Sequence, residues 1–136
     1  PFVVLERDRA RCEELGRMGW PVVLGDATVP EVLQTAGVRT ARLLIVATSD
    51  TFQSRRAIEL AQRLNPGIDI VVRTHSDAET QLLRSQGIGR VIMGEHELAR
   101  TMAHYVLRRF GVPPDRARLL VEDNAAAELE AQAERR

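Results

Sequence analysis

A carboxylate stands at the end of the first apolar run of the chain. Residues Phe2–Leu5 are apolar and are followed directly by Glu6. In an α/β protein with a parallel sheet, a carboxylate at the carboxyl end of a strand faces the crevice in which nucleotides bind. Glu6 is therefore placed to accept hydrogen bonds from both hydroxyls of an adenosine ribose. The alternative from the residues alone is a solvated charge that pairs with Arg7 or Arg9.

A second apolar run, Val22–Leu24, ends in Gly25, Asp26 and Ala27. A carboxylate at this turn can approach the edge of an adenine, or it can cap free amides of the turn itself. Both readings of Asp26 stay open, and Gly25 can serve the backbone geometry alone.

A third run, Leu43–Ala47, is followed by Thr48, Ser49 and Asp50. The Thr48 hydroxyl can donate to a ribose or a phosphate, so Ala47 and Thr48 are expected to line the pocket. Asp50 is expected to be the N-cap of the next helix.

Arg73 is the cation best placed to meet a phosphate. It ends the run "IDIVVR", and a guanidinium at a strand end suits bidentate contact with phosphate oxygens. A salt bridge to a nearby acid such as Asp77 is the equally open alternative.

These side chains need a parallel sheet with crossover helices to bring them together. Apolar runs rich in Val, Ile and Leu alternate with stretches in which apolar residues recur every three or four positions, the pattern of an α/β fold. The expected strands are Phe2–Leu5, Val22–Leu24, Leu43–Ala47, Ile68–Val72 and Val91–Met93. The expected helices are Arg9–Met18, Pro30–Ala36 with Thr28 as its cap, Asp50–Leu64, Asp77–Gln86 and Glu95–Phe110.

Composition narrows the function classes. The chain has 136 residues, with 19 basic and 19 acidic side chains and a formal net charge of zero, so no overall field favours nucleic acid. All of the basic residues are arginines, which excludes Schiff-base and P-loop lysine chemistry. No nucleophile and base are paired by spacing, and the three histidines lack the spacing of metal ligands. We expect neither an enzyme nor a metal site.

The expected sheet lacks its central strand. If Phe2–Leu5 is the second strand of the order 3-2-1-4-5-6, the first strand should lie between it and Leu43–Ala47. No G-x-G-x-x-G phosphate loop occurs in the 136 residues, since Gly87 and Gly89 are followed by Ile92 at the third glycine position. We therefore expect the two inner edges to pair directly or with another chain, and the missing residues to lie upstream in a longer protein.

Four segments resemble the regulator-of-conductance or TrkA-N type of nucleotide-binding domain found in Kef-type cation:proton antiporters. They are "PFVVLERD", "VVLGDATVPEVLQTAGV", "RLLIVATSD" and "VIMGEHELARTM". The resemblance implies a Rossmann-like doubly wound parallel sheet without its first strand and glycine loop. It covers residues 1–111 as the domain, with 112–136 as a tail that is partly helical or disordered.

The resemblance also implies a function. Such domains are cytoplasmic sensors of NAD(H), AMP or another adenine nucleotide, work as homodimers, and regulate a membrane transporter at the inner membrane of a bacterium. The implied nucleotide-binding residues are Glu6, Arg7, Gly25, Asp26, Ala27, Ala47, Thr48 and Arg73. The alternative is the NAD-binding half of an NAD-dependent oxidoreductase.

Overall fold

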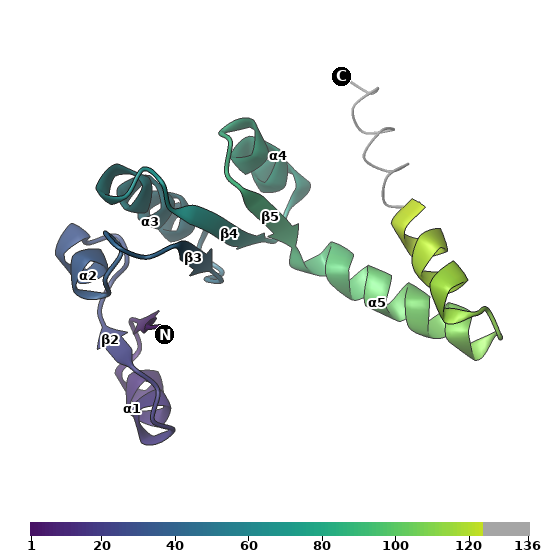
Figure 1. The fold of residues 1–136 in the computed structure, drawn as a ribbon, viewed down its shortest axis with the longest axis horizontal. Coiled ribbons are helices and arrows are strands. Elements are labelled where there is room, and N and C mark those ends of the chain that lie inside the picture. Colours follow the sequence, from purple (N-terminus) through teal and green to yellow (C-terminus); the bar gives the residue numbers. More distant parts are fainter. Residues whose placement is uncertain (124–136) are drawn as a thin grey trace. The chain divides into compact units, whose positions relative to one another are not determined.

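The computed structural model describes residues 1–123 and divides into two compact units, Pro1–Met93 and Gly94–Arg136. The first unit alternates strands with helices, and the described residues of the second, 94–123, are mainly helical (Figure 1). The boundary predicted at residue 111 from the family resemblance stays a prediction, and each unit is described here by itself.

Five strands and four helices form the first unit. The strands are β1 (Val4–Glu6), β2 (Val22–Leu24), β3 (Leu43–Val46), β4 (Asp69–Thr74) and β5 (Arg90–Met93). The helices are α1 (Arg9–Arg17), α2 (Pro30–Thr35), α3 (Thr51–Leu64) and α4 (Asp77–Ser85). The predicted α/β class with parallel strands is confirmed, and the predicted bounds differ by one or two residues at most ends.

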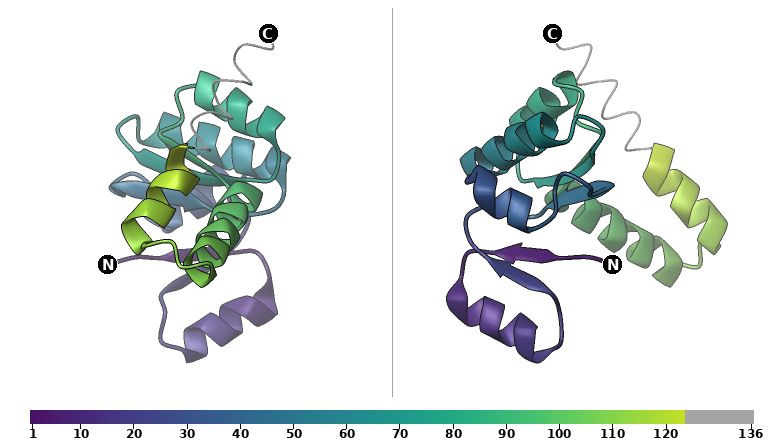
Figure 2. Two further views of the ribbon diagram at one scale, coloured as in Figure 1. Left: turned by 90° about the vertical axis from the view of Figure 1, so that its right-hand side faces the viewer. Right: turned by 60° about the vertical axis from the view of Figure 1, so that its left-hand side comes forward.

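The strands form two separate parallel sheets. β1 pairs with β2, and β3, β4 and β5 pair in that order. The prediction that the first and third runs pair directly was wrong, because β1 and β3 share no hydrogen bonds and lie in different sheets (Figure 2). Each of these strands has one edge without a partner strand within residues 1–123. Leu43 and Ile45 of β3 alternate with Leu44 and Val46, which face the core, and they are 48% and 67% exposed on the opposite face of the sheet.

One hydrophobic core holds the first unit together. It gathers apolar side chains of one face of β3–β5 with side chains of α2, α3 and α4, namely Leu33, Val38, Val46, Ile58, Leu60, Ala61, Ile68, Ile70, Val72, Leu83, Ile88 and Val91. Helices α3 and α4 both lie on this face (Figures 1 and 2), as right-handed crossovers require. Leu5 of β1 and Ala27 pack against the same core, so the two-stranded sheet is attached to the rest of the unit.

Local side-chain caps fix most of the helix starts. Asp8, Asp50 and Ser76 accept hydrogen bonds from backbone amides in the first turns of α1, α3 and α4, which confirms Asp50 as a cap. α2 differs, because its N-cap is Val29 without a side-chain bond. The expectation that Thr28 caps α2 was therefore wrong.

The second unit contains α5 (Gly94–Arg109) and a helical segment at 114–123. Among its described residues, Ala117 alone is buried. Within residues 1–123, no helix combines the length and the apolarity that crossing a bilayer requires.

Asn65 joins two turns of the first unit. Its Nδ2 donates to the carbonyl oxygens of Val38 and Ala41 at 3.0 and 2.8 Å, and its Oδ1 accepts from the amide of Gly67 at 3.3 Å. These bonds tie the chain before β3 to the turn before β4, so Asn65 holds adjacent strands in their register.

Replacing Asn65 with Ala should lower the free energy of unfolding by about 1–3 kcal/mol, because two partly buried carbonyls lose their donor. Urea denaturation followed by circular dichroism measures this difference. Thr40→Ala is the matched control, since that exposed hydroxyl makes one long contact with Gly37 at 3.4 Å. Equal midpoints for Asn65→Ala and the control would show that the turns hold without this side chain.

Candidate functional site

The eight predicted site residues lie at or just after the carboxyl ends of parallel strands, in two groups. Glu6 is the last residue of β1 and Arg7 follows it, and both lie beside Gly25, Asp26 and Ala27, which follow β2. The amide of Gly25 donates to the Glu6 carbonyl oxygen at 2.9 Å. The second group, Ala47, Thr48 and Arg73, lies at the ends of β3 and β4. Within residues 1–123, no hydrogen bond or ion pair joins the two groups.

Glu6 holds the turn that leaves β1. Its Oε1 accepts hydrogen bonds from the backbone amides of Arg7 and Asp8 at 2.7 and 2.9 Å. The alternative of an ion pair with Arg7 or Arg9 was wrong in this respect, because the partners are amides rather than guanidinium groups. One carboxylate oxygen is thus committed to the chain, and the side chain is held in one orientation.

A contact with α1 also holds the carboxyl end of β1. The Sγ of Cys12 donates to the Glu6 carbonyl oxygen at 3.4 Å, beside the bond from Gly25 to the same oxygen. Burial is the largest cause of the raised pKa of the Cys12 thiol, and the Glu6 carboxylate adds to it. Cys12 is therefore a packed thiol that positions Glu6 through its backbone.

Gly25 is required by packing. A Cβ at this position would lie 2.7 and 2.9 Å from the two γ-methyl groups of Val32 in α2. Any larger residue would push α2 away from the end of β2. The φ of Gly25 is not positive, so packing against Val32, and not the backbone geometry that we expected, calls for a glycine here; its role toward a ligand stays a prediction.

Asp26 closes its own turn. Its Oδ1 accepts from the amide and the hydroxyl of Thr28 at 2.8 and 2.7 Å. The backbone bond and then the side-chain bond of Thr28 lower the pKa of Asp26, aided by the charge of Arg7 and opposed by burial. The capping role is present in the structure, and adenine recognition by Asp26 stays a prediction.

The second group has its own local bonds. Thr48 Oγ1 accepts from the amide of Asp50 at 3.2 Å, and Ala47 and Thr48 are exposed. The Nη2 of Arg73 donates to the carbonyl oxygen of Ala47 at 2.7 Å. β4 continues to Thr74, so Arg73 lies one residue before the strand end and spans from β4 to the end of β3.

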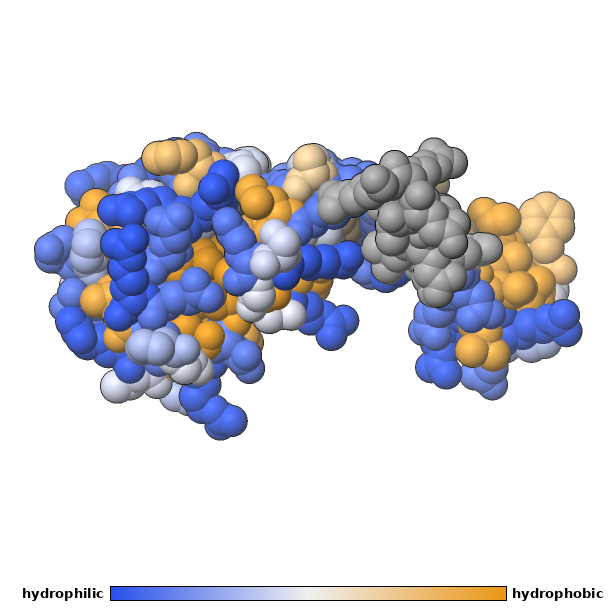
Figure 3. Space-filling model, turned by 90° about the horizontal axis from the view of Figure 1, so that it is seen from above, coloured by the Kyte–Doolittle hydropathy of each residue, from blue (hydrophilic) through white to orange (hydrophobic). Residues whose placement is uncertain are grey.

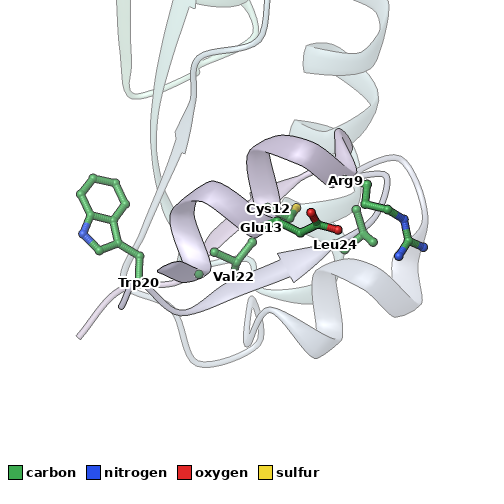
Figure 4. A pocket seen from close by; sticks show the side chains of 7 residues that line it. Arg9, Cys12, Glu13, Trp20, Val22 and Leu24 are labelled. Atoms are coloured by element: carbon green, nitrogen blue, oxygen red, sulfur yellow. The ribbon is translucent and has the colours of Figure 1, made fainter. Parts of the chain in front are cut away.

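A hollow in the surface of the first unit lies away from these residues. Its volume is about 290 Å³, and it lies between α1 and β2 (Figure 4). Its lining residues are Arg9, Cys12, Glu13, Gly16, Trp20, Val22 and Leu24. None of the eight predicted residues lines it. We place the candidate site at the strand ends because ligands of open parallel sheets bind outside the carboxyl ends of the strands.

Two residues that shape the site were missed by the sequence reasoning. Thr28 follows Asp26 by two positions, the spacing of an Asx turn, and that signal could have identified the pair. Cys12 carries no such signal, because its contact with the Glu6 carbonyl depends on how α1 packs on β1.

Because the hydrogen bonds from Thr28 lower the pKa of Asp26, the free energy of unfolding should depend on pH through this carboxylate. The folded-state pKa lies below the unfolded value of about 3.9, so this contribution is present above that value and is lost as the pH falls through the folded-state pKa. Between about pH 6 and about pH 2, the stability difference between the wild type and Asp26→Asn should therefore stay constant down to about pH 5 and then shrink as the pH falls through the unfolded value of about 3.9 and below it. Urea midpoints across this range measure it.

Thr28→Val is the graded control, since it keeps the amide donor to Asp26 and removes the hydroxyl donor. Its pH dependence should fall between those of the wild type and Asp26→Asn. A stability difference that stays constant with pH would contradict the role given to these bonds.

Comparisons with known proteins agree with this geometry. The family model described as the TrkA-N domain matches residues 1–94. The inner membrane protein YbaL of Escherichia coli (strain K12) is 37% identical over 102 residues, 75% of this chain and 18% of YbaL. The glutathione-regulated potassium-efflux system protein KefC of Cronobacter sakazakii is 31% identical over 117 residues, 86% of this chain and 19% of KefC. The chain thus spans less than a fifth of these relatives.

Solved structures share the fold. The crystal structure of the TrkA-N domain of YbaL matches with a TM-score of 0.70 over 75% of this chain and 76% of that chain. The Kef C-terminal domain of Shewanella denitrificans, solved in an AMP-bound form, matches with a TM-score of 0.74 at 18% identity over 96% of this chain and 94% of that chain. The GsuK channel bound to NAD matches with a TM-score of 0.67 at 24% identity over 75% of this chain and 18% of that chain. The family match over residues 1–94 and the Rossmann-like arrangement of the strands show that this chain belongs to the TrkA-N domain family.

Proposed function

We propose that this chain senses an adenine nucleotide or NAD(H) and regulates a membrane transporter that moves potassium or another monovalent cation in exchange for protons. It acts from the cytoplasmic face of a bacterial inner membrane, as a homodimer whose rearrangement on ligand binding gates the ion flux. The observation that supports this proposal best is the position of the Glu6 carboxylate at the end of β1, where the backbone amides of Arg7 and Asp8 donate to it.

The relatives support the choice of transporter. KefC is named as part of a potassium-efflux system, and YbaL as an inner membrane protein. Two proteins that share the fold were solved with AMP and with NAD. An adenosine moiety is common to both ligands, and the β1 and β2 ends of this chain offer the two carboxylates suited to it.

The chemistry of the first group fits an adenosine. With Oε1 of Glu6 occupied by two amides, its second oxygen is left to accept from ribose hydroxyls. Asp26 likewise commits one oxygen to Thr28 and keeps the other for an adenine amino group. The local bonds hold both carboxylates in place before a ligand arrives, which reduces the entropy cost of binding.

The second group fits the phosphate side. Arg73 is an exposed guanidinium next to the carbonyl of Ala47 and near the hydroxyl of Thr48, and its remaining N–H groups can meet phosphate oxygens. A glycine loop at a helix N-terminus would supply the backbone amides that hold a pyrophosphate. In our proposal, this loop follows a strand that pairs with the free edges of both β1 and β3. Strand and loop lie upstream of Pro1 in a longer chain.

The test of this site is the affinity of Glu6 variants for NADH and AMP, in a chain extended upstream to include that strand. Glu6→Ala should weaken binding by about 10- to 150-fold, because a doubly bonded charged acceptor contributes about 1.5–3 kcal/mol. Calorimetric titration measures the change.

Two further variants separate ligand contact from local structure. Glu6→Gln keeps an oxygen for the amides of Arg7 and Asp8 and should still lose affinity through its lost charge. Glu14→Ala removes an exposed acid of α1 and should bind as the wild type does. Wild-type affinity in both Glu6 variants would make Glu6 a solvated strand-end charge.

The 136-residue chain should bind dinucleotides poorly, because none of its segments has the glycine pattern that cradles a pyrophosphate. NADH fluorescence titrated against this chain and against the upstream-extended chain compares the two. Equal and tight binding by both would mean that the first strand is misplaced in our assignment, and the role of Glu6 would fall with it.

A further inference from the structure

Three segments of the first unit form the amino edge of the sheet β3–β5 and concentrate arginines there. Each segment leads from the end of a helix to the start of a strand, and together they are residues 36–42, 63–69 and 84–90. They hold five arginines and a single acid, Asp69. We call these five residues the arginine edge: Arg39, Arg42, Arg63, Arg84 and Arg90.

Backbone contacts hold the three segments side by side. The amide of Asp69 donates to the carbonyl oxygen of Arg42 at 3.0 Å, and Asn65 joins the turn before β3 to the turn before β4. Arg90 pairs in register with Val71, two residues after Asp69. Neighbouring strands lie about 4.8 Å apart, so β3 and β5 are separated by about 10 Å across β4. The arginines therefore lie along one edge of the unit.

The charge of this edge is largely unpaired. All five arginines are exposed, and within residues 1–123 none of their side chains forms a hydrogen bond or an ion pair. Arg56 and Arg73, by contrast, bond to Glu59 and to the Ala47 carbonyl. Hydrophilic side chains cover much of the first unit in the left-hand part of Figure 3. The arginine edge thus has guanidinium groups to offer to an anion.

Helix dipoles account for only part of this arrangement. Arg63 and Arg84 lie in the last turns of α3 and α4, where a cation is favourable. Arg39, Arg42 and Arg90 lie outside the helices. Because like charges that lie close together repel each other, a cluster of unpaired cations is typical of a surface that meets an anion.

The opposite edge of the same sheet carries the opposite charge. Asp50 and Asp77 follow the carboxyl ends of β3 and β4, so the sheet is polarised although the chain has no net charge. Exposed charges act within about one Debye length, roughly 8 Å at physiological ionic strength. An extended anionic surface would therefore attract the arginine edge and leave the other edge facing away.

The course of the longer chain favours a membrane as this anionic surface. In our proposed function, the upstream strand runs parallel to β3 beside it, so it begins at the edge where β3 begins. The transporter precedes that strand, and the chain then reaches the arginine edge directly from the bilayer. The cytoplasmic leaflet is anionic, and guanidinium groups bind phosphate oxygens in bidentate fashion.

We infer that the arginine edge contacts the phosphate groups of anionic lipids beside the attached transporter. This inference rests on the proposed function and deepens it, because it gives the domain an orientation at the membrane. The strand ends that carry the candidate nucleotide site then face away from the lipid, where a soluble nucleotide can reach them.

Co-sedimentation with lipid vesicles tests the contact. The 136-residue chain is mixed with vesicles of phosphatidylcholine alone, or of phosphatidylcholine with about one third phosphatidylglycerol, at low ionic strength. We expect the chain to sediment with the anionic vesicles and to stay in solution with the neutral ones. Sodium chloride at about 0.5 M should release it, because salt screens exposed charges.

Paired substitutions locate the contact on the surface. Arg42→Gln combined with Arg90→Gln should weaken binding to the anionic vesicles by roughly 25-fold, because each arginine near such a surface contributes about five-fold. Arg11→Gln combined with Arg55→Gln is the matched control. It removes the same charge from exposed positions near the starts of α1 and α3 and should bind as the wild type does. Circular dichroism checks that both double variants are folded.

Two outcomes would overturn the inference. Failure of the wild type to bind anionic vesicles would leave the arginine edge to another anion, such as an acidic protein segment. Equal losses in the two double variants would show attraction to overall charge without a defined surface. Neither outcome changes the affinity of the Glu6 variants for nucleotide, so the proposed ligand site is judged independently.

Discussion

Parallel strand pairing is the constraint on which the candidate site depends. Each of the three strand pairs is parallel, so the carboxyl ends of the paired strands meet at one edge of each sheet. That arrangement alone brings Glu6 beside Gly25 and Asp26, and Arg73 beside Ala47. One edge each of β1 and β3 has no partner strand within residues 1–123. The site that we propose therefore has its side chains at each sheet, and the backbone amides that a phosphate needs would come from a glycine loop.

Local hydrogen bonds in the first group hold the two turns, and in our proposal they also orient the carboxylates for the ligand. The Glu6 and Asp26 carboxylates each bind two donors from the residues that follow them. A free carboxylate would sample several rotamers and lose that freedom on binding. Because one oxygen of each is already held, the other is offered in a fixed direction, as pre-organised sites require.

Much of this fold could be predicted from the sequence, because apolar periodicity decides which segments are strands and which are helices. Asp50 was identified as a cap because Asp at that position has one common structural role. Thr28 was misassigned because α2 begins one residue later than expected, with Val29 at the N-cap position, and the Thr28 hydroxyl donates to the Asp26 carboxylate instead. The separation of β1 from β3 could not be predicted either, since direct pairing depends on how Leu5 and Ala27 pack on the core. The contact between Arg73 and Ala47 required the register of β3 and β4.

The sensor function that we propose requires a change at the ligand site to reach another surface, and β5 offers a short route for it. Arg73 lies in register with Ile92 of β5, and Met93 ends that strand. α5 begins at Gly94 with no linker between them, and the boundary of the two units falls at this peptide. A ligand that draws Arg73 from the Ala47 carbonyl would act one residue pair away from the start of α5.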